Sequence, residues 1–130
     1  MAEPISIRVP KSEHGDKPYI LLGEPVPDAP ALAITPAWDR RTGAWSGHFA
    51  VTHIATGTYI PRMYGCITCI RRAATILAAM PVDWAAMTLD RDSNTAVAGE
   101  HLAAIRRLAN DVWSGCYAAL AMCEGAEVAR

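Results

Sequence analysis

The residues best suited to chemistry by type and spacing are Cys66 and Cys69, which form a Cys-x-x-Cys pair. Apolar residues three and four apart follow them, so the pair is expected to open an amphipathic helix with both thiols on one face. A helix N-terminus favours the thiolate and lowers the pKa of a thiol. The spacing therefore predicts either a dithiol redox site or part of a metal site.

Zinc is the metal that four thiolates would hold, and Cys116 and Cys123 bring the number of cysteines to four. Seven residues along one helix separate these two by about 10 Å of axial rise. That is too far to share one tetrahedral ion unless the helix breaks. The alternative is that Cys116 and Cys123 are small apolar residues on a buried stripe and that all four thiols are reduced.

A second set of residues is suited to binding. Trp38 and Trp45 flank Arg40 and Arg41 within one expected hairpin. Aromatic rings stack on bases while guanidinium groups reach phosphates, but the same tryptophans can instead staple the hairpin by cross-strand packing. We predict a partner-binding surface formed by Trp38, Arg40, Arg41, Trp45, His48 and Arg62.

The histidines form no recognisable catalytic set. His48 and His53 are five residues apart, so they are expected on opposite faces of the sheet. His53 is expected to hold the following turn by a hydrogen bond. The chain contains no Gly-x-Ser-x-Gly elbow, Walker loop or Gly-x-Gly-x-x-Gly motif. We therefore expect a protein that is not an enzyme and that has no resident cofactor, zinc being the one candidate.

Charge is distributed unevenly along the chain, although the net charge is only −1. Residues 29–82 carry five arginines against Asp39, a net charge of +4, whereas residues 83–130 carry four arginines against seven acids. The balance of the whole chain argues against a general nucleic-acid-binding protein, but the middle segment permits an anionic partner. The alternative is that these arginines only solubilise a sheet edge and a helix face.

Nothing in the sequence predicts a membrane protein. No apolar run follows the first four residues, as a signal peptide would require. The uncharged run at residues 73–82 is too short to span a bilayer. We therefore expect a cytoplasmic protein that contacts no membrane.

Strand-type residues fill the N-terminal half, where prolines limit the length of each element. Six of the nine prolines lie in residues 1–30 and exclude helices there. The chain is expected to reverse at Asp39–Gly43 and at Thr56–Gly57, Pro36 to mark an edge or a bend, and Pro61 to end the last strand. Strands are expected at residues 5–9, 19–22, 32–35, 45–52 and 58–60, with a connector at 24–30.

Helical periodicity replaces alternation from Cys66 onward. A first helix is expected to end before Pro81, and Asp83 is expected to cap a short turn at residues 84–87. Residues 90–94 are expected to be a polar loop. One apolar stripe then runs from Ala98 to Cys123. It predicts a last helix roughly 40 Å long, which bends at Gly115 or packs on a second copy of the chain.

These elements predict a single α+β domain over residues 1–130, in which an antiparallel sheet of four to five strands is packed by C-terminal helices that include one long last helix. The expected function is that of a non-enzymatic binding or accessory protein, which contacts a protein or a nucleic acid through the basic hairpin. One alternative is a thiol- or zinc-dependent protein built on Cys66 and Cys69. Another is a homodimer or larger assembly held by the last helix.

Two resemblances bear on these expectations. A V-T-H-x-x-T-G hairpin (residues 51–57), an alanine-rich helix and a P-x-D-W step (residues 81–84) resemble small uncharacterised phage and prophage-type proteins of GC-rich bacteria. The likeness covers roughly residues 45–85 and implies an accessory or host-interaction protein of a mobile element. The Cys-x-x-Cys spacing resembles that of thioredoxin-like proteins, but those place the motif in a β-α-β unit. By topology alone the chain is similar to some single-strand-binding proteins.

Overall fold

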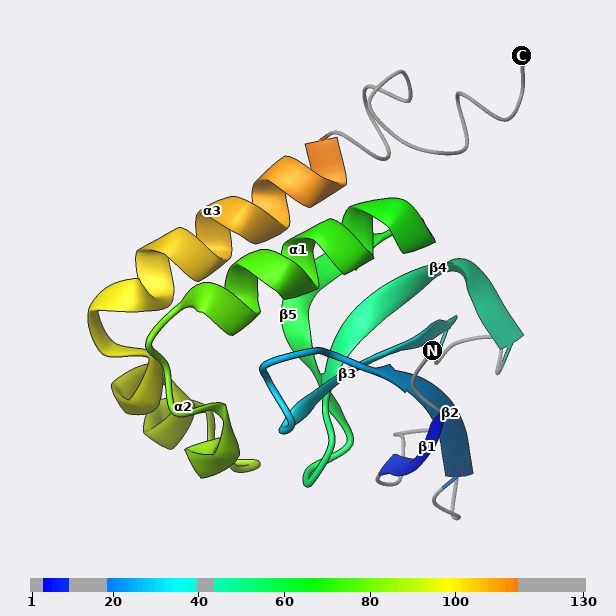
Figure 1. Ribbon diagram of the computed structural model, residues 1–130, viewed down its shortest axis with the longest axis horizontal. Helices are drawn as coiled ribbons and strands as arrows, with labels where there is room; N and C mark the ends of the chain where they lie inside the picture. Colours follow the sequence, from blue (N-terminus) through cyan, green and yellow to red (C-terminus); the bar gives the residue numbers. More distant parts are fainter. Residues whose placement is uncertain (1–3, 10–18, 40–43, 115–130) are drawn as a thin grey trace.

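An antiparallel sheet of five strands, covered on one face by helices, forms the described part of the chain, residues 4–9, 19–39 and 44–114, in the computed structural model (Figure 1). The strands lie in the order β1-β2-β3-β4-β5. The fold is therefore α+β, as the sequence predicts. Its elements are β1 (Ile5–Val9), β2 (Tyr19–Pro25), β3 (Leu32–Asp39), β4 (Ala44–His53), β5 (Thr58–Gly65), α1 (Ile67–Ala79), the 3₁₀ turn η1 (Trp84–Ala86), α2 (Arg91–Ala98), the 3₁₀ turn η2 (Gly99–His101) and α3 (Leu102–Trp113).

The main core lies between the sheet and the two helices α1 and α3, which run side by side over it (Figure 1). β4 alternates as its sequence predicts, since Phe49 and Val51 pack into this core while Ala50 and Thr52 face the other way. The buried side chains of the core include Leu32, Ile34, Val51, Ile60, Met63, Ile70, Leu77, Trp84, Ile105 and Val112.

The face of the sheet that turns away from the helices is also buried. The side chains buried there are mostly small, and β1 contributes the largest of them. Ile7, Ala33 and Thr35 converge on Gly23 of β2. A Cβ at Gly23 would lie 2.6 Å from Ile7 Cδ1 and 3.1 Å from Ala33 Cβ, so glycine leaves the space that the Ile7 side chain fills. The fully buried residues of this face are Ile7, Ala33, Thr35, Ala50 and Thr52.

A pair of buried hydroxyls lies on this face, where Thr35 Oγ1 and Thr52 Oγ1 are 2.7 Å apart and both residues are 0% exposed. Either Thr35→Val or Thr52→Val should lower the free energy of unfolding by about 1–3 kcal/mol, because each leaves one buried hydroxyl unpaired. The double variant should be close to wild type, because it removes both. Urea denaturation of the four proteins measures the coupling, and a double variant whose loss equals the sum of the single losses would contradict this interpretation.

Three expectations about the strands need correction. Pro61 does not end β5, which continues to Gly65 because a bulge accommodates the proline. The connector expected from Glu24 begins later, since Glu24 and Pro25 still pair with β3. β3 continues past the expected end at Thr35 to Asp39. The expectation that Pro36 marks an edge is confirmed, since β2 pairs with β3 only at Ile34 and Ala33.

The helices follow the predicted stripe, but their starts differ from the expectation. Residues 90–94 open α2 rather than forming a loop, because Asp90 caps the helix by accepting from the Asp92 N–H at 3.0 Å. Asp83 makes no side-chain cap of η1. Gly99, at φ 53°, ends α2 and turns the chain through η2 into α3, the last described helix. The predicted bend at Gly115 and the remainder of the stripe lie outside the described residues.

Candidate functional site

β5 is the edge strand of the sheet, and a wide bulge interrupts its pairing with β4. Thr52 pairs with Tyr59 and Ala50 pairs with Tyr64, so residues 60–63 of β5 lie opposite a single residue of β4. Within the bulge Arg62 has a φ of 62°, a left-handed conformation that residues other than glycine rarely adopt. Consecutive residues of β5, from Thr58 to Arg62, border the space between β5 and the helices.

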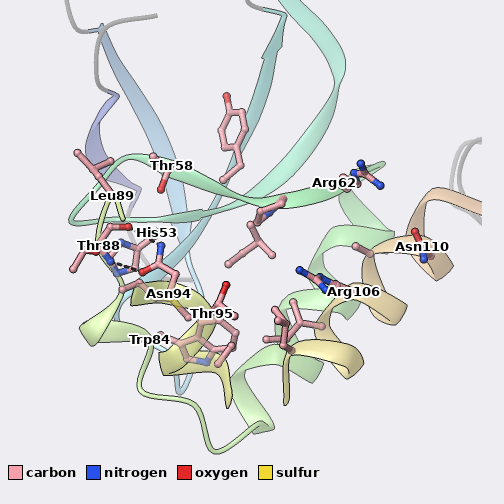
Figure 2. Close-up of a pocket in the computed structure, with 18 residues that line it drawn as sticks. His53, Thr58, Arg62, Trp84, Thr88, Leu89, Asn94, Thr95, Arg106 and Asn110 are labelled. Carbon is pink, nitrogen blue, oxygen red and sulfur yellow. Dashed lines mark hydrogen bonds between the residues drawn. The ribbon is translucent and has the colours of Figure 1, made fainter. Parts of the chain in front are cut away.

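A cleft of about 680 Å³ lies between this bulge and the helical arm formed by η1, α2, η2 and α3 (Figure 2). This volume falls in the range of small-molecule sites, about 300–1,000 Å³. Aspartate and glutamate are absent from its described lining. The apolar lining includes Ile60, Trp84, Met87, Leu102 and Ile105, and the polar lining includes His53, Thr58, Arg62, Thr95, Arg106 and Asn110.

Positive charge gathers at one end of the cleft. In Figure 2 Arg62 from β5 and Arg106 from α3 lie toward the same end, together with Asn110. Both arginines are exposed, and neither forms an ion pair with a described residue. The residues three and four positions from Arg106 on α3 are Leu102, Ala103, Ala109 and Asn110, so its own helix offers it no carboxylate.

Arg71 of α1 provides a contrast, because its charge is neutralised within the fold. Its guanidinium donates to both carboxylate oxygens of Glu24 on β2, at 2.8 and 3.0 Å. This hydrogen bonding, opposed by partial burial, lowers the pKa of the Glu24 carboxyl. The pair joins the sheet to α1.

His53 lies at the floor of the cleft, at the end of β4, and is only 3% exposed. Its Nδ1 is 2.8 Å from Thr56 Oγ1, which in turn lies 2.7 Å from Thr58 Oγ1. The expectation that His53 holds the turn is therefore confirmed. Its Nε2 is buried and makes no hydrogen bond to the described residues. Burial lowers the pKa of His53. The backbone of Trp84 raises this pKa, but by less than burial lowers it.

Lowering the pH below 6.5 should destabilise the fold through His53. Its folded pKa lies below the unfolded value of 6.5, so the unfolded chain takes up this proton first as the pH falls. The free energy of unfolding should therefore fall between pH 6.5 and the folded pKa, by at most about 1.4 kcal/mol per pH unit. Glu24 acts in a separate window, since its lowered pKa removes stability only as the pH falls below 4.5.

The measurement is urea denaturation from pH 8 to pH 5 for the wild-type chain and for His53→Asn, which keeps a polar atom near Thr56. The variant should lose most of the slope below pH 6.5. An unchanged slope in His53→Asn would show that another group causes the pH dependence.

Asn94 and Thr88 tie the start of α2 to the segment before it, on the same side of the cleft as His53 (Figure 2). The Thr88 N–H donates to Asn94 Oδ1, and Asn94 Nδ2 donates to the Thr88 carbonyl, each at 2.7 Å. Because both ends of the amide are used, we assign Asn94 to holding this wall of the cleft.

The structure does not bring the predicted partner-binding residues together as one surface. Arg62 lines the cleft, whereas strand alternation places His48 on the face of β4 that turns away from the helices. The backbones of Trp38 and Trp45 are directly paired across β3 and β4, immediately after a register shift between Ala37 and Trp38. Arg40 and Arg41 lie outside the described residues.

The cysteine pair sits where the sequence places it. Cys66 is the N-cap of α1, its Sγ 3.5 Å from the Cys69 backbone nitrogen, and Cys69 is buried; neither is in a disulfide. Within residues 4–9, 19–39 and 44–114 no group of three His, Cys, Asp or Glu side chains could hold a metal. Cys116 and Cys123, which a four-cysteine zinc site would need, lie outside the described residues.

The sequence did not point to Arg106, and of the wall formed by residues 58–62 it indicated only Arg62. Arg106 and Asn110 are four residues apart on one side of α3, a helix with few other polar groups facing the sheet, and this spacing was the available signal. The bulge left only the weak signal of a proline inside a strand-type run.

No protein-family model, curated protein or solved structure matches the chain. Among the described residues, no helix combines the length and apolar character that crossing a membrane requires.

Proposed function

We propose that the protein is a non-enzymatic binding protein whose binding site is the cleft between β5 and the helical arm. The observation that carries the proposal is a cleft of ligand size, about 680 Å³, with apolar walls and two arginines that form no ion pair with described residues. A strained residue, Arg62, lies in its wall. Strained backbone persists where surrounding structure maintains it, often at ligand sites.

The chemistry of the lining favours binding over catalysis. Its described side chains include no cysteine, lysine or carboxylate that could act as a nucleophile or a base. The one histidine, His53, uses Nδ1 in the turn and is only 3% exposed. A site of this kind holds and orients a ligand more readily than it moves protons.

A fragment screen by thermal shift tests this proposal, with Thr95→Trp as the variant that fills the cleft and Ala96→Trp as its matched control. Both residues are exposed on α2, but only Thr95 lines the cleft. Fragments that stabilise the wild-type chain should lose their effect on Thr95→Trp and keep it on Ala96→Trp. A screen in which no fragment binds, or in which all fragments bind Thr95→Trp normally, would contradict the proposal.

The basic hairpin is a second candidate, favoured by one observation. Trp38 and Trp45 are cross-strand partners, and they flank Arg40 and Arg41 in the sequence. We propose contact with a protein or nucleic acid there as an independent possibility, tested by titrating labelled oligonucleotides at low salt against wild type and Arg40→Ala/Arg41→Ala. We also propose a cytoplasmic location, a mobile-element context and self-association through the last helix. Sedimentation tests the self-association.

A further inference from the structure

We infer that the ligand of the cleft is a small organic anion, with an apolar body and one carboxylate or phosphate group held at the end where Arg62 and Arg106 lie. This inference rests on the proposed function and adds to it the chemical class of the ligand. Three features of the described residues support it: the charge of the lining, the placement of Arg62 and the shape of the edge strand.

The charge of the cleft is positive and is not balanced by the fold. Arg62 and Arg106 come from separate elements, β5 and α3, and Figure 2 shows both toward one end of the cleft. The described lining contains no carboxylate, and neither arginine takes part in an ion pair with a described residue. An anion bound at this end of the cleft would receive charge-assisted hydrogen bonds from a guanidinium group.

The backbone of Arg62 gives a second, independent reason. A φ of 62° would be relaxed for glycine and strained for arginine. The bulge nevertheless carries an arginine at this point, and that arginine lines the cleft. A role for the guanidinium in the cleft accounts for a residue type that the local backbone disfavours.

The rest of the cleft sets the size and polarity of the ligand. Ile60, Trp84, Leu102 and Ile105 line its body. Inorganic phosphate alone would leave this apolar volume unfilled, so the anion must carry an apolar group. An extended peptide is disfavoured, because Pro61 and the bulge remove the regular N–H and C=O row that strand addition needs, and α3 packs over the same strand.

The test uses the full chain and ten pairs of small acids and their neutral amides, from phenylacetate and phenylacetamide to 4-phenylbutyrate and 4-phenylbutanamide, measured by ligand-observed NMR and calorimetry. Among binders, the acid should bind at least about tenfold more tightly than its amide. Added sodium chloride should weaken the binding of the acid and leave the binding of the amide unchanged. Arg106→Gln should remove the preference, whereas Arg72→Gln, an exposed arginine of α1 outside the cleft, should leave it intact.

Arg62→Gly separates binding from folding. It should reduce the preference for the acid while raising the urea midpoint, because glycine relaxes the backbone at this position. Asp28→Gly, at φ 66° in the β2–β3 connection, should raise the midpoint without changing the preference. If amides bind as tightly as acids and Thr95→Trp blocks both, the inference fails and the proposed function stands. If no acid binds while neutral fragments do, the inference also fails, and if nothing binds, both fail.

Discussion

Trp84→Ala is expected to lower the free energy of unfolding by about 3–5 kcal/mol, because it removes a large side chain that is only 6% exposed within the main core. The indole also joins two elements, since its Nε1 donates to the Leu77 carbonyl at 3.2 Å and holds η1 against the end of α1. Trp84 lines the cleft as well, so the variant should lose ligand affinity even under conditions where it remains folded.

Two control variants are compared with Trp84→Ala by urea denaturation. Trp84→Phe should lose less, because it keeps an aromatic ring and because the Leu77 carbonyl still accepts from the Met80 N–H. Trp113→Ala, at 49% exposure on α3, should change the free energy of unfolding by less than about 1 kcal/mol. Equal losses at Trp84 and Trp113 would contradict the described core.

Leu77→Ala is expected to have a comparable effect on stability, a loss of about 2–5 kcal/mol, with no direct effect on binding. Leu77 is fully buried on the face of α1 that packs into the main core. Its truncation therefore leaves a cavity that the surrounding residues close only in part. Ile76, its neighbour at 44% exposure, is the matched control and should lose much less when replaced by alanine. Urea denaturation measures the free energy of unfolding of both variants. A larger loss for Ile76→Ala than for Leu77→Ala would contradict the assigned orientation of α1.

The two variants together separate the core from the cleft. Leu77 does not line the cleft, so Leu77→Ala should bind the acid probes with unchanged affinity wherever the protein is folded. Trp84→Ala should bind them weakly under the same conditions. Loss of affinity in both would indicate that binding reports only on global stability.

The parts of the fold that the sequence predicts are those set by local pattern. Alternation in β4 correctly separates Phe49 and Val51 from Ala50 and Thr52, and the three- and four-residue spacing after Cys66 correctly predicts α1. His53 holds its turn as expected, because its partner Thr56 is three residues away. Each of these features depends on residues that are neighbours in the sequence.

The features that the sequence does not reveal depend on contacts between distant segments. A proline normally ends a strand, but in β5 the edge position and the bulge accommodate Pro61, and neither can be read from residues 58–65 alone. The start of α2 is an exception, because its cap is the local contact from the Asp92 N–H to Asp90 and could have been read from residues 90–94. The cleft combines β5 with η1, α2 and α3, so Arg106 could not be joined to Arg62 without the tertiary structure.

The most direct test of the account is the map of amide chemical-shift changes when an isotopically labelled chain is titrated with 4-phenylbutyrate, or with the tightest of the acid probes. We expect changes concentrated in residues 58–62 of β5, around Trp84, and along the faces of α2 and α3 that line the cleft. These changes should be absent in Thr95→Trp. Changes centred on the hairpin at residues 38–45, or no saturable changes in any part of the chain, would contradict the assignment of this cleft as the binding site.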